Sequence, residues 1–332
     1  MRVRHRTATV FKSTVPALFL AVVLMLPSGT GRAAGEPIET IESLYNTILI
    51  FRRGDHVTLS FGYNKRLYTE SVYNTANKAE LPVTYTRYMT AALAYVPEAR
   101  ALLEIGFGGG RTAWYLHSHR PDAAVTSVEL DPEVIRMAKK YFDIEERENF
   151  TVAQGDGRIF LLKTDRRYDM IMIDAYRGPF VPFHLLTREF YELVKRRLAD
   201  GGVVAQNIEP TTMLFDAAAV TLKAVFDQVE FFVAGGNVVS IAYDGERRSQ
   251  DALMAAAGAL QQEHGFYHPL PEMLSERRLL AEFPDREPLT DDFAPVESLK
   301  AIEQHNRKWL DPETGAAVEG ETPATGEDAA GQ

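Results

Sequence analysis

The segment Leu102–Gly110 constrains the fold of this chain more than any other part of the sequence. It reads L-L-E-I-G-F-G-G-G, an apolar run that predicts a β-strand and then breaks into Gly106, Gly108 and Gly110. Helix-compatible sequence follows from Arg111. Glycines let the backbone turn sharply and approach a ligand closely, and the start of a helix presents free N–H groups. The segment therefore predicts a strand–loop–helix unit beside a ligand site.

A second strand-like run, Val125–Leu130, ends on the acidic residues Glu129 and Asp131. A carboxylate about 20 residues after a glycine loop, at the tip of the second strand, suits a ribose, whose two hydroxyls both donate hydrogen bonds. Asp131 precedes Pro132 and fits a helix N-cap better. The order of these features favours a nucleotide or nucleoside site over a tight turn with no ligand.

Strand-like and helix-like segments alternate from Ala101 to Tyr243. The expected strands are Ala101–Ile105, Val125–Leu130, Phe150–Ala153, Tyr168–Ile173 and Val203–Gln206, then a hairpin of Val229–Val233 with Val238–Ala242. The expected helices are Leu81–Tyr95, Arg111–His119, Pro132–Phe142, Gly157–Leu162, Thr187–Leu198, Thr211–Phe226, Ser249–His264 and Pro271–Glu282. This alternation predicts an α/β fold with a doubly wound, mostly parallel sheet, and ligands outside the carboxyl ends of its strands.

The chain ends are expected to lie outside this fold. Residues 1–35 combine basic residues, the apolar run Val15–Leu26 and small residues up to Ala33 and Ala34, which is typical of a secretory signal peptide. The run is too short to span a bilayer of about 30 Å, so the sequence predicts an exported, periplasmic or secreted protein without stable membrane insertion after cleavage. An uncleaved anchor is the alternative.

Three domains or segments are expected after the signal peptide. Residues 39–80 alternate in short strand-like runs and predict a small antiparallel β-domain. Residues 81–310 would form the nucleoside-binding domain. Residues 311–332 are rich in Gly, Glu, Thr, Ala and Pro without apolar periodicity and are expected to be disordered.

Composition excludes several classes of site. A net charge of −10 argues against a nucleic-acid-binding surface, which needs clustered Lys and Arg. The absence of cysteine excludes disulfides, thiolate nucleophiles and cysteine-bound metals. The eight histidines show no paired spacing, so no metal site is expected.

Two further acids follow predicted strands. Asp156 lies between glycines, which suits a carboxylate that accepts from an exocyclic amine such as that of adenine, or an N-cap of the helix at Gly157. Asp174 follows an all-apolar strand and precedes a loop with two prolines and three aromatics. Such a carboxylate could act as a general base or hold a cationic amine, or could simply close a local turn. His184 fits a loop or packing role.

Several runs of the sequence resemble the spermidine synthase (polyamine aminopropyltransferase) family. The similarity is strongest between Ala101 and Asn207. The runs are V-E-L-D-P-E-V-I-R-M-A-K-K-Y-F, G-D-G-R-I-F-L, Y-D-M-I-M-I-D-A-Y and L-T-R-E-F-Y-E-L-V-K-R-R-L-A-D-G-G-V-V-A-Q-N. The late run L-T-D-D-F-A-P-V-E resembles the branch often fused to membrane transporter segments.

The resemblance implies a small N-terminal β-domain before a Rossmann-like domain of the class I methyltransferase type, and a homodimer. It implies transfer of an aminopropyl group from decarboxylated S-adenosylmethionine to a diamine. By position it places Glu129 at the ribose, Asp156 with Gly157 at the adenine, Asp174 as the acid that deprotonates the attacking amine, and Tyr85 along the substrate.

The chain departs from the family pattern at positions that would face an amine. Gly109 stands where the glycine loop of the family has an acid, Arg111 follows, and Arg177 replaces the second acid of a D-x-x-D motif. A dication would be repelled by an unpaired arginine, so our hypothesis is that Arg111 or Arg177 pairs with a carboxylate. That carboxylate would belong to intact S-adenosylmethionine or to an acidic acceptor. The ring of Tyr176 is available to hold a cation.

The sequence thus predicts a transferase that moves an aminopropyl or related alkyl group from a sulfonium nucleoside to a small-molecule amine. The donor would be decarboxylated S-adenosylmethionine or S-adenosylmethionine, and no metal is expected. Two alternatives stay open. A methyltransferase fits the E-x-G-x-G-x-G loop, and a non-catalytic nucleoside- or polyamine-binding protein fits the loss of amine-holding acids.

Overall fold

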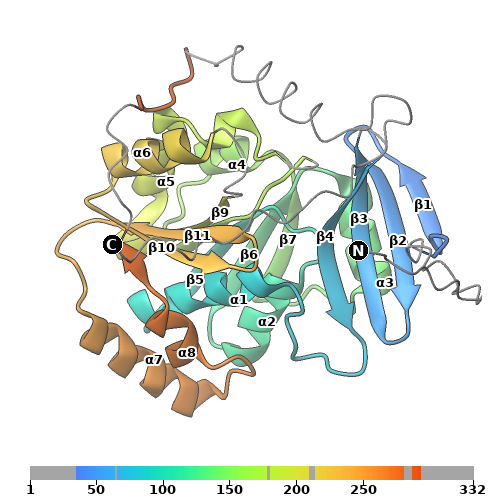
Figure 1. The fold of residues 1–332 in the computed structure, drawn as a ribbon, viewed down its shortest axis with the longest axis horizontal. Coiled ribbons are helices and arrows are strands. Elements are labelled where there is room, and N and C mark those ends of the chain that lie inside the picture. The colour runs from blue at the N-terminus through green and yellow to red at the C-terminus, as the bar shows by residue number, and fades with distance from the viewer. Residues whose placement is uncertain (1–34, 64–65, 178–179, 209–213, 280–285, 293–332) are drawn as a thin grey trace, which may run out of the picture. The chain divides into compact units, whose positions relative to one another are not determined.

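The computed structural model describes residues 35–63, 66–177, 180–208, 214–279 and 286–292 (Figure 1). The predicted tail (311–332) lies outside these residues, as does the predicted signal peptide apart from Gly35. The described chain contains two β-sheets and the helices that pack on them.

The smaller sheet, within the described residues, has four antiparallel strands in the order β1-β2-β3-β4. They are β1 (Glu39–Glu42), β2 (Thr47–Arg53), β3 (His56–Tyr63) and β4 (Arg66–Asn74). Alternate residues such as Ile48, Ile50 and Leu59 are buried in the main core, because successive side chains of a strand point to opposite faces. The expected N-terminal antiparallel sheet is confirmed.

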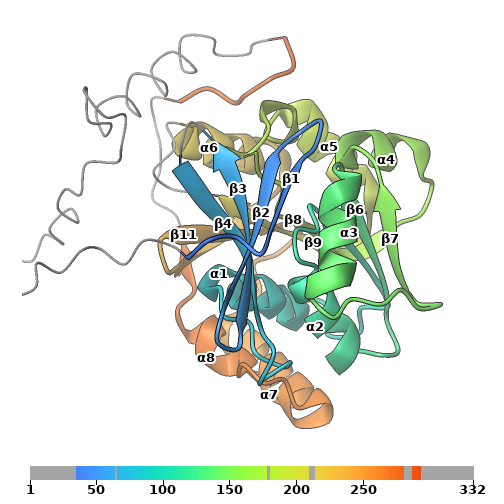
Figure 2. The same cartoon turned by 90° about the vertical axis from the view of Figure 1, so that its right-hand side faces the viewer.

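Polar contacts join the smaller sheet to helix α3 (Pro132–Tyr141), which lies beside β1 in Figure 2. Lys140 Nζ and the Tyr141 hydroxyl each donate a hydrogen bond of 2.5 Å to the Glu39 carboxylate. The hydrogen bonds from Lys140 and Tyr141 hold the pKa of Glu39 below its usual value. A more distant ion pair with Arg136 acts in the same direction. The edge strand β1 of the smaller sheet is thereby tied to helix α3.

The larger sheet follows the order β12-β10-β11-β9-β8-β5-β6-β7 over the described residues. Its parallel part comprises β5 (Ala101–Ile105), β6 (Ala124–Glu129), β7 (Phe150–Gln154), β8 (Tyr168–Ile173) and β9 (Leu198–Ile208). Its antiparallel part comprises β10 (Gln228–Ala234), β11 (Asn237–Tyr243) and β12 (Arg278–Leu279). This confirms the predicted doubly wound, mostly parallel sheet. Strand β5 lies between β8 and β6, and the order of the strands along the chain reverses at this point.

Helices cover both faces of this sheet. The remaining elements are α1 (Thr84–Thr90), η1 (Ala91–Tyr95), α2 (Arg111–His119), α4 (Gly157–Lys163), η2 (Phe183–Leu185), α5 (Arg188–Arg197), α6 (Phe215–Val225), α7 (Gln250–His264) and α8 (Leu270–Ser275). Several helices begin with a side-chain cap: Asp131 caps α3, Thr187 caps α5 and Ser249 caps α7. Each of these side chains accepts a hydrogen bond from a backbone N–H group of the first turn.

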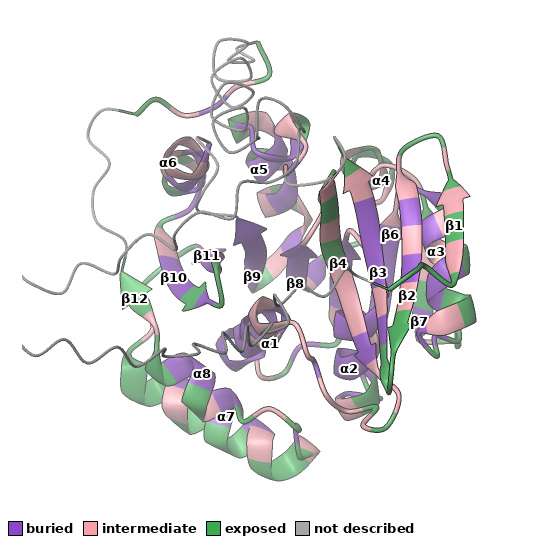
Figure 3. Ribbon diagram, turned by 45° about the vertical axis from the view of Figure 1, so that its right-hand side comes forward, coloured by how far each residue is buried: buried purple, intermediate pink, exposed green. Residues whose placement is uncertain are grey.

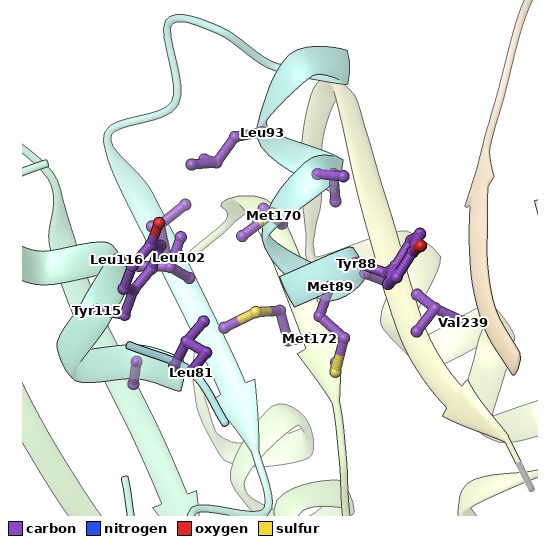
Figure 4. Close-up of a cluster of buried hydrophobic side chains, with 14 of the residues drawn as sticks. Leu81, Tyr88, Met89, Leu93, Leu102, Tyr115, Leu116, Met170, Met172 and Val239 are labelled. Carbon is purple, nitrogen blue, oxygen red and sulfur yellow. The ribbon is translucent and has the colours of Figure 1, made fainter. Parts of the chain in front are cut away.

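Two large apolar clusters lie on opposite faces of the sheet. One contains side chains of α1, η1, α2, α7 and the smaller sheet, and the other contains side chains of α4, α5 and α6. Figure 3 shows β8 and β9 buried between them, while one side of α7 is exposed. Figure 4 shows part of the first cluster, with residues of α1 and η1 gathered beside Met170 and Met172 of β8.

Two predicted segments differ from the structure. The helix expected over Pro271–Glu282 ends at Ser275, because Arg278 and Leu279 pair with β10 and extend the sheet instead. The strand expected over Val203–Gln206 is longer in the structure: β9 begins at Leu198, directly after α5, and includes Gly201 and Gly202. Gly201 has φ +74° there, and the pairing register of β8 with β9 shifts near this point.

Candidate active site

A cavity of about 720 Å³ lies at the edge of the larger sheet where its parallel strands end. Its wall includes residues of the loops after β5, β6, β7 and β8, and also residues of α1 and β4. Glu129, Asp156 and Asp174 follow three different strands, and all three line this cavity. Acids that follow three different strands therefore share one cavity.

The glycine loop is shaped by close packing between neighbouring segments. Gly106 has φ +90°, and a Cβ atom at this position would lie 2.3 Å from the carbonyl oxygen of Asp174. Gly108 lines the cavity with φ +52°. Gly110 is not among the lining residues: with φ +69° it caps α2, and the ring of Phe107 fills the space of a side chain. Its contribution to the site is the turn into the helix.

The Glu129 carboxylate is held by backbone N–H groups of the loops around it. Its Oε2 accepts from Phe107 N at 3.0 Å and from Gly108 N at 3.3 Å, and its Oε1 accepts from Asp131 N at 3.0 Å. Burial raises the pKa of Glu129, and these N–H groups oppose the rise. A carboxylate oxygen has further lone pairs, so both oxygens can still accept from a diol.

Asp156 combines a helix cap with a place on the cavity wall. Its Oδ1 accepts from Ile159 N at 2.9 Å at the start of α4, and its Oδ2 lies 2.9 Å from His184 Nε2. The bond from His184 is the main cause that lowers the pKa of Asp156. Gly157 is needed because a Cβ atom there would lie 2.3 Å from a methyl carbon of Ile105. His184 lines the cavity, which its interpretation as a loop residue did not include.

Asp174 is fixed by two hydrogen bonds. Its Oδ2 accepts from the hydroxyl of Tyr85 on α1 at 3.1 Å, and its Oδ1 accepts from Asn207 Nδ2 at 2.9 Å. Burial raises the pKa of Asp174 to about 6, although both bonds act in the opposite direction. Asn237 in turn donates to Asn207 Oδ1 at 3.0 Å. A carboxylate with this pKa is mostly ionised at neutral pH and can accept a proton.

Asn207 was not found from the sequence. It lies near the end of β9, and its carbonyl oxygen also accepts from the Tyr176 hydroxyl at 3.1 Å. The signal that could have found it is a buried polar residue where a parallel strand ends, in line with the acids of the neighbouring strands. Tyr85 and Tyr176, like Asp174, line the cavity.

The two arginines have different surroundings. The Arg111 guanidinium donates to the carbonyl oxygens of Phe142 at 3.0 Å and Lys78 at 2.5 Å, and lies 4.3 Å above the centre of the Tyr73 ring. Nη1 and Nη2 of Arg111 are thus directed to backbone groups, which argues against Arg111, one of the two arginines of our hypothesis, as the partner of a substrate carboxylate. Its buried Nε has no hydrogen-bond partner among the described residues. Arg177 has an exposed side chain and lines the cavity.

Across the described ranges, no group of three or more His, Asp or Glu side chains is placed to bind a metal ion. None of the helices in the same ranges is both long and apolar enough to cross a membrane.

Comparison with known proteins identifies the family. Residues 84–235 match the model of the spermine/spermidine synthase domain. A polyamine aminopropyltransferase of Vibrio vulnificus is 30% identical over 290 residues, which cover 85% of this chain and 96% of the relative. The chain belongs to the spermidine synthase (polyamine aminopropyltransferase) family.

Solved structures agree on the fold. A spermidine synthase in complex with the transition state analogue AdoDATO has a TM-score of 0.58 and 20% identity, and covers 74% of this chain and 85% of that one. Human methyltransferase-like protein 13 in complex with SAH has a TM-score of 0.51 and 24% identity, over 61% of this chain and 97% of that one. Both support the Rossmann-like, methyltransferase-type fold predicted for the larger domain.

Proposed function

We propose that the protein transfers an aminopropyl or related alkyl group from a sulfonium nucleoside to an amine, with Asp174 as the general base. The carrying observation is the position of Asp174, a partly buried carboxylate with a pKa raised to about 6, in the same cavity as Glu129 and Asp156. The nucleoside would place its ribose at Glu129 and its adenine at Asp156 and Gly157. Binding of AdoDATO by a spermidine synthase of the same fold supports a donor of this class.

The reaction needs one base and no acid. The lone pair of the amine nitrogen attacks the carbon attached to the sulfonium, the carbon–sulfur bond breaks, and its electron pair passes to sulfur. The sulfur leaves as a neutral thioether, and the nitrogen gives one proton to Asp174. Tyr85 and Asn207 donate to the two oxygens of Asp174 and so fix their direction towards the amine.

The proposed substrates are decarboxylated S-adenosylmethionine or S-adenosylmethionine and a small-molecule amine. Arg177, exposed at the cavity wall, would pair with a carboxylate of the donor or of an acidic acceptor. Tyr176 would offer its ring to the cationic end of the acceptor.

Product analysis with purified protein tests the proposal. We expect methylthioadenosine from decarboxylated S-adenosylmethionine in the presence of a diamine or polyamine, and a loss of at least about 100-fold in Asp174→Asn, since a positioned base contributes about that much or more. The matched control is Asp165→Asn, the same chemical change at a fully exposed acid. S-adenosylhomocysteine formed from S-adenosylmethionine would instead identify a methyltransferase, and nucleoside binding without any product would identify a binding protein.

We also propose that the chain is exported and acts as a homodimer. The basic and apolar pattern of residues 1–35 supports export. N-terminal sequencing of protein purified from the periplasm or medium should begin after Ala33 or Ala34, whereas an intact N-terminus in the membrane fraction would support the anchor. Light scattering of the mature protein should give twice the mass of one chain.

A further inference from the structure

The late run L-T-D-D-F-A-P-V-E is a sequence feature that the proposed reaction does not use. Its first four residues, 289–292, belong to the described segment 286–292, and the rest of the run lies outside the described residues. Leu289 is buried in the apolar cluster that contains side chains of α4, α5 and α6. Its N–H donates to the Thr221 hydroxyl on α6 at 2.8 Å, and its carbonyl oxygen accepts from Arg188 N on α5 at 2.8 Å. The run is therefore docked on the helices of one face of the larger sheet.

The docked run presents Asp291 to an arginine of the helix that begins at the proposed adenine site. Arg158 is the second residue of α4, and Asp156 caps the same helix. Arg158 and Asp291 form a bidentate ion pair: Nη1 donates to Oδ1 at 2.8 Å, and Nη2 donates to Oδ2 at 2.5 Å. Oδ1 of Asp291 also accepts from the Thr187 hydroxyl at 2.8 Å. Two parallel hydrogen bonds fix the direction of a guanidinium as well as its position.

Arg158 in turn holds the loop that carries His184. Its Nη1 donates to the carbonyl oxygen of His184 at 3.1 Å. Nε2 of His184 lies 2.9 Å from Oδ2 of Asp156, and both residues line the cavity. Oδ1 of Asp156 accepts from Ile159 N, so His184 is the side chain that fixes the second oxygen of this carboxylate. These contacts, from Asp291 through Arg158 and His184 to Asp156, form what we call the Asp291 relay.

The fold does not depend on the ion pair that begins the relay. The side chain of Arg158 is 19% exposed and that of Asp291 is 40% exposed. An ion pair with this much contact with water contributes little to stability. The segment is also held by the buried side chain of Leu289 and by both backbone groups of that residue. Loss of the ion pair should therefore change the direction of the groups that it holds and leave the fold in place.

We propose that Asp291 is a positioning residue for the nucleobase end of the cavity. Through Arg158 and His184 it holds the Asp156 carboxylate where it accepts from the exocyclic amine of adenine, and so it sets the preference for adenine over a base without that amine. The inference rests on the nucleoside part of the proposed function and deepens it. Hypoxanthine has a carbonyl oxygen in place of the amine, so two acceptors would face each other at Asp156 and the hydrogen bond would be lost.

Titration calorimetry of the purified protein with methylthioadenosine and methylthioinosine tests the proposal, because these nucleosides differ only in the base. In the wild type we expect at least a tenfold preference for methylthioadenosine. In Asp291→Asn the preference should fall at least threefold, while the affinity for methylthioinosine changes less than twofold. Whichever way the new amide turns, its NH₂ group would face an N–H group of Arg158.

The matched control is Asp292→Asn, the same change at the next residue of the run. The side chain of Asp292 is exposed and lies outside the relay, so this variant should keep the full preference. Arg158→Gln breaks the relay from its other end and should lower the preference by a similar factor. The double variant should lower it no further, because both changes act on the same contacts.

An unchanged preference in Asp291→Asn would overturn the proposal. Equal losses for both nucleosides would overturn it too, because they would indicate a structural role, and so would effects of the two single variants that multiply in the double variant. If Asp291→Asn does not fold, Arg158→Gln decides in its place by the same two measurements.

Failure of the relay and failure of the proposed function give different results. A wild type that binds both nucleosides equally would contradict the proposed place of adenine at Asp156, and the relay with it. A preference that survives in Asp291→Asn would contradict the relay alone. A preference that depends on Asp291 supports the relay even where no product forms, and the missing product would then contradict the transferase proposal alone.

Discussion

Asp174→Asn should make the protein more stable while it removes the proposed base. Burial raises the pKa of this carboxyl group from 3.8 to about 6, so its charge is held at a cost in the folded state. Asparagine has nearly the same shape and no charge. Its oxygen can accept from Asn207 Nδ2, and its NH₂ group can donate to the Tyr85 hydroxyl oxygen.

The size and sign of the effect follow from the pKa shift. A rise of about 2 units corresponds to about 3 kcal/mol between the charged and neutral forms. Because the pKa of Asp174 is higher in the folded protein, its contribution to stability falls as the pH rises from 3.8 to about 6. Relative to the wild type, Asp174→Asn should therefore gain little at pH 4 and up to about 3 kcal/mol at pH 8.

Urea denaturation of both proteins at pH 4 and pH 8, followed by tryptophan fluorescence, measures this difference. Other groups that titrate in the window affect both proteins equally, so the gap between the two free energies of unfolding isolates Asp174. Asp165→Asn, an exposed control, should show no such gap. A gap of the same size at both pH values would refute the argument that burial penalises the charge of Asp174.

Three further predictions concern groups away from the base. His268 Nε2 accepts a hydrogen bond from Leu81 N at 2.9 Å, and burial lowers the pKa of His268 to about 4. The protein should therefore lose stability as the pH falls from 6.5 towards 4, and His268→Asn should flatten the dependence of the urea midpoint on pH. Glu230 is fully buried and paired with Arg277 at 2.8 Å, so Glu230→Gln should lower the free energy of unfolding by about 3 to 5 kcal/mol, measured by urea denaturation. A loss under about 1 kcal/mol would contradict this. Gly106→Ala adds a Cβ atom at φ +90° against a backbone carbonyl and should abolish nucleoside binding in calorimetry, whereas unchanged affinity would show that the loop can move.

The core strands could be predicted because each is a short apolar run between turn residues. Tyr168–Ile173 agrees with β8 at both ends, and such runs are typical of strands buried on both faces. The end of α8 could not be predicted in this way. Arg278 and Leu279 were expected in the helix but pair with the edge strand β10 instead. That edge exists only in the assembled sheet, so local sequence could not reveal the pairing.

The candidate site also contains residues whose place could be predicted from the sequence and residues whose place could not. Acids that follow strands could be placed on one rim, because the carboxyl ends of parallel strands share an edge. The direction of Arg111 could not, since it depends on the ring of Tyr73 and on two carbonyl oxygens from other segments.

Ser71 links the smaller sheet to the glycine loop that follows β5 of the larger sheet. This residue of β4 accepts from Gly109 N at 2.8 Å, and so a strand of the smaller sheet holds the loop that would cradle the nucleoside. Grafting the first eighty residues of a homologue onto this chain would therefore alter the glycine loop as well as the smaller sheet. Substitutions that shift β4 would be transmitted by the same bond to Gly109, so a change in the N-terminal sheet would also reshape the glycine loop.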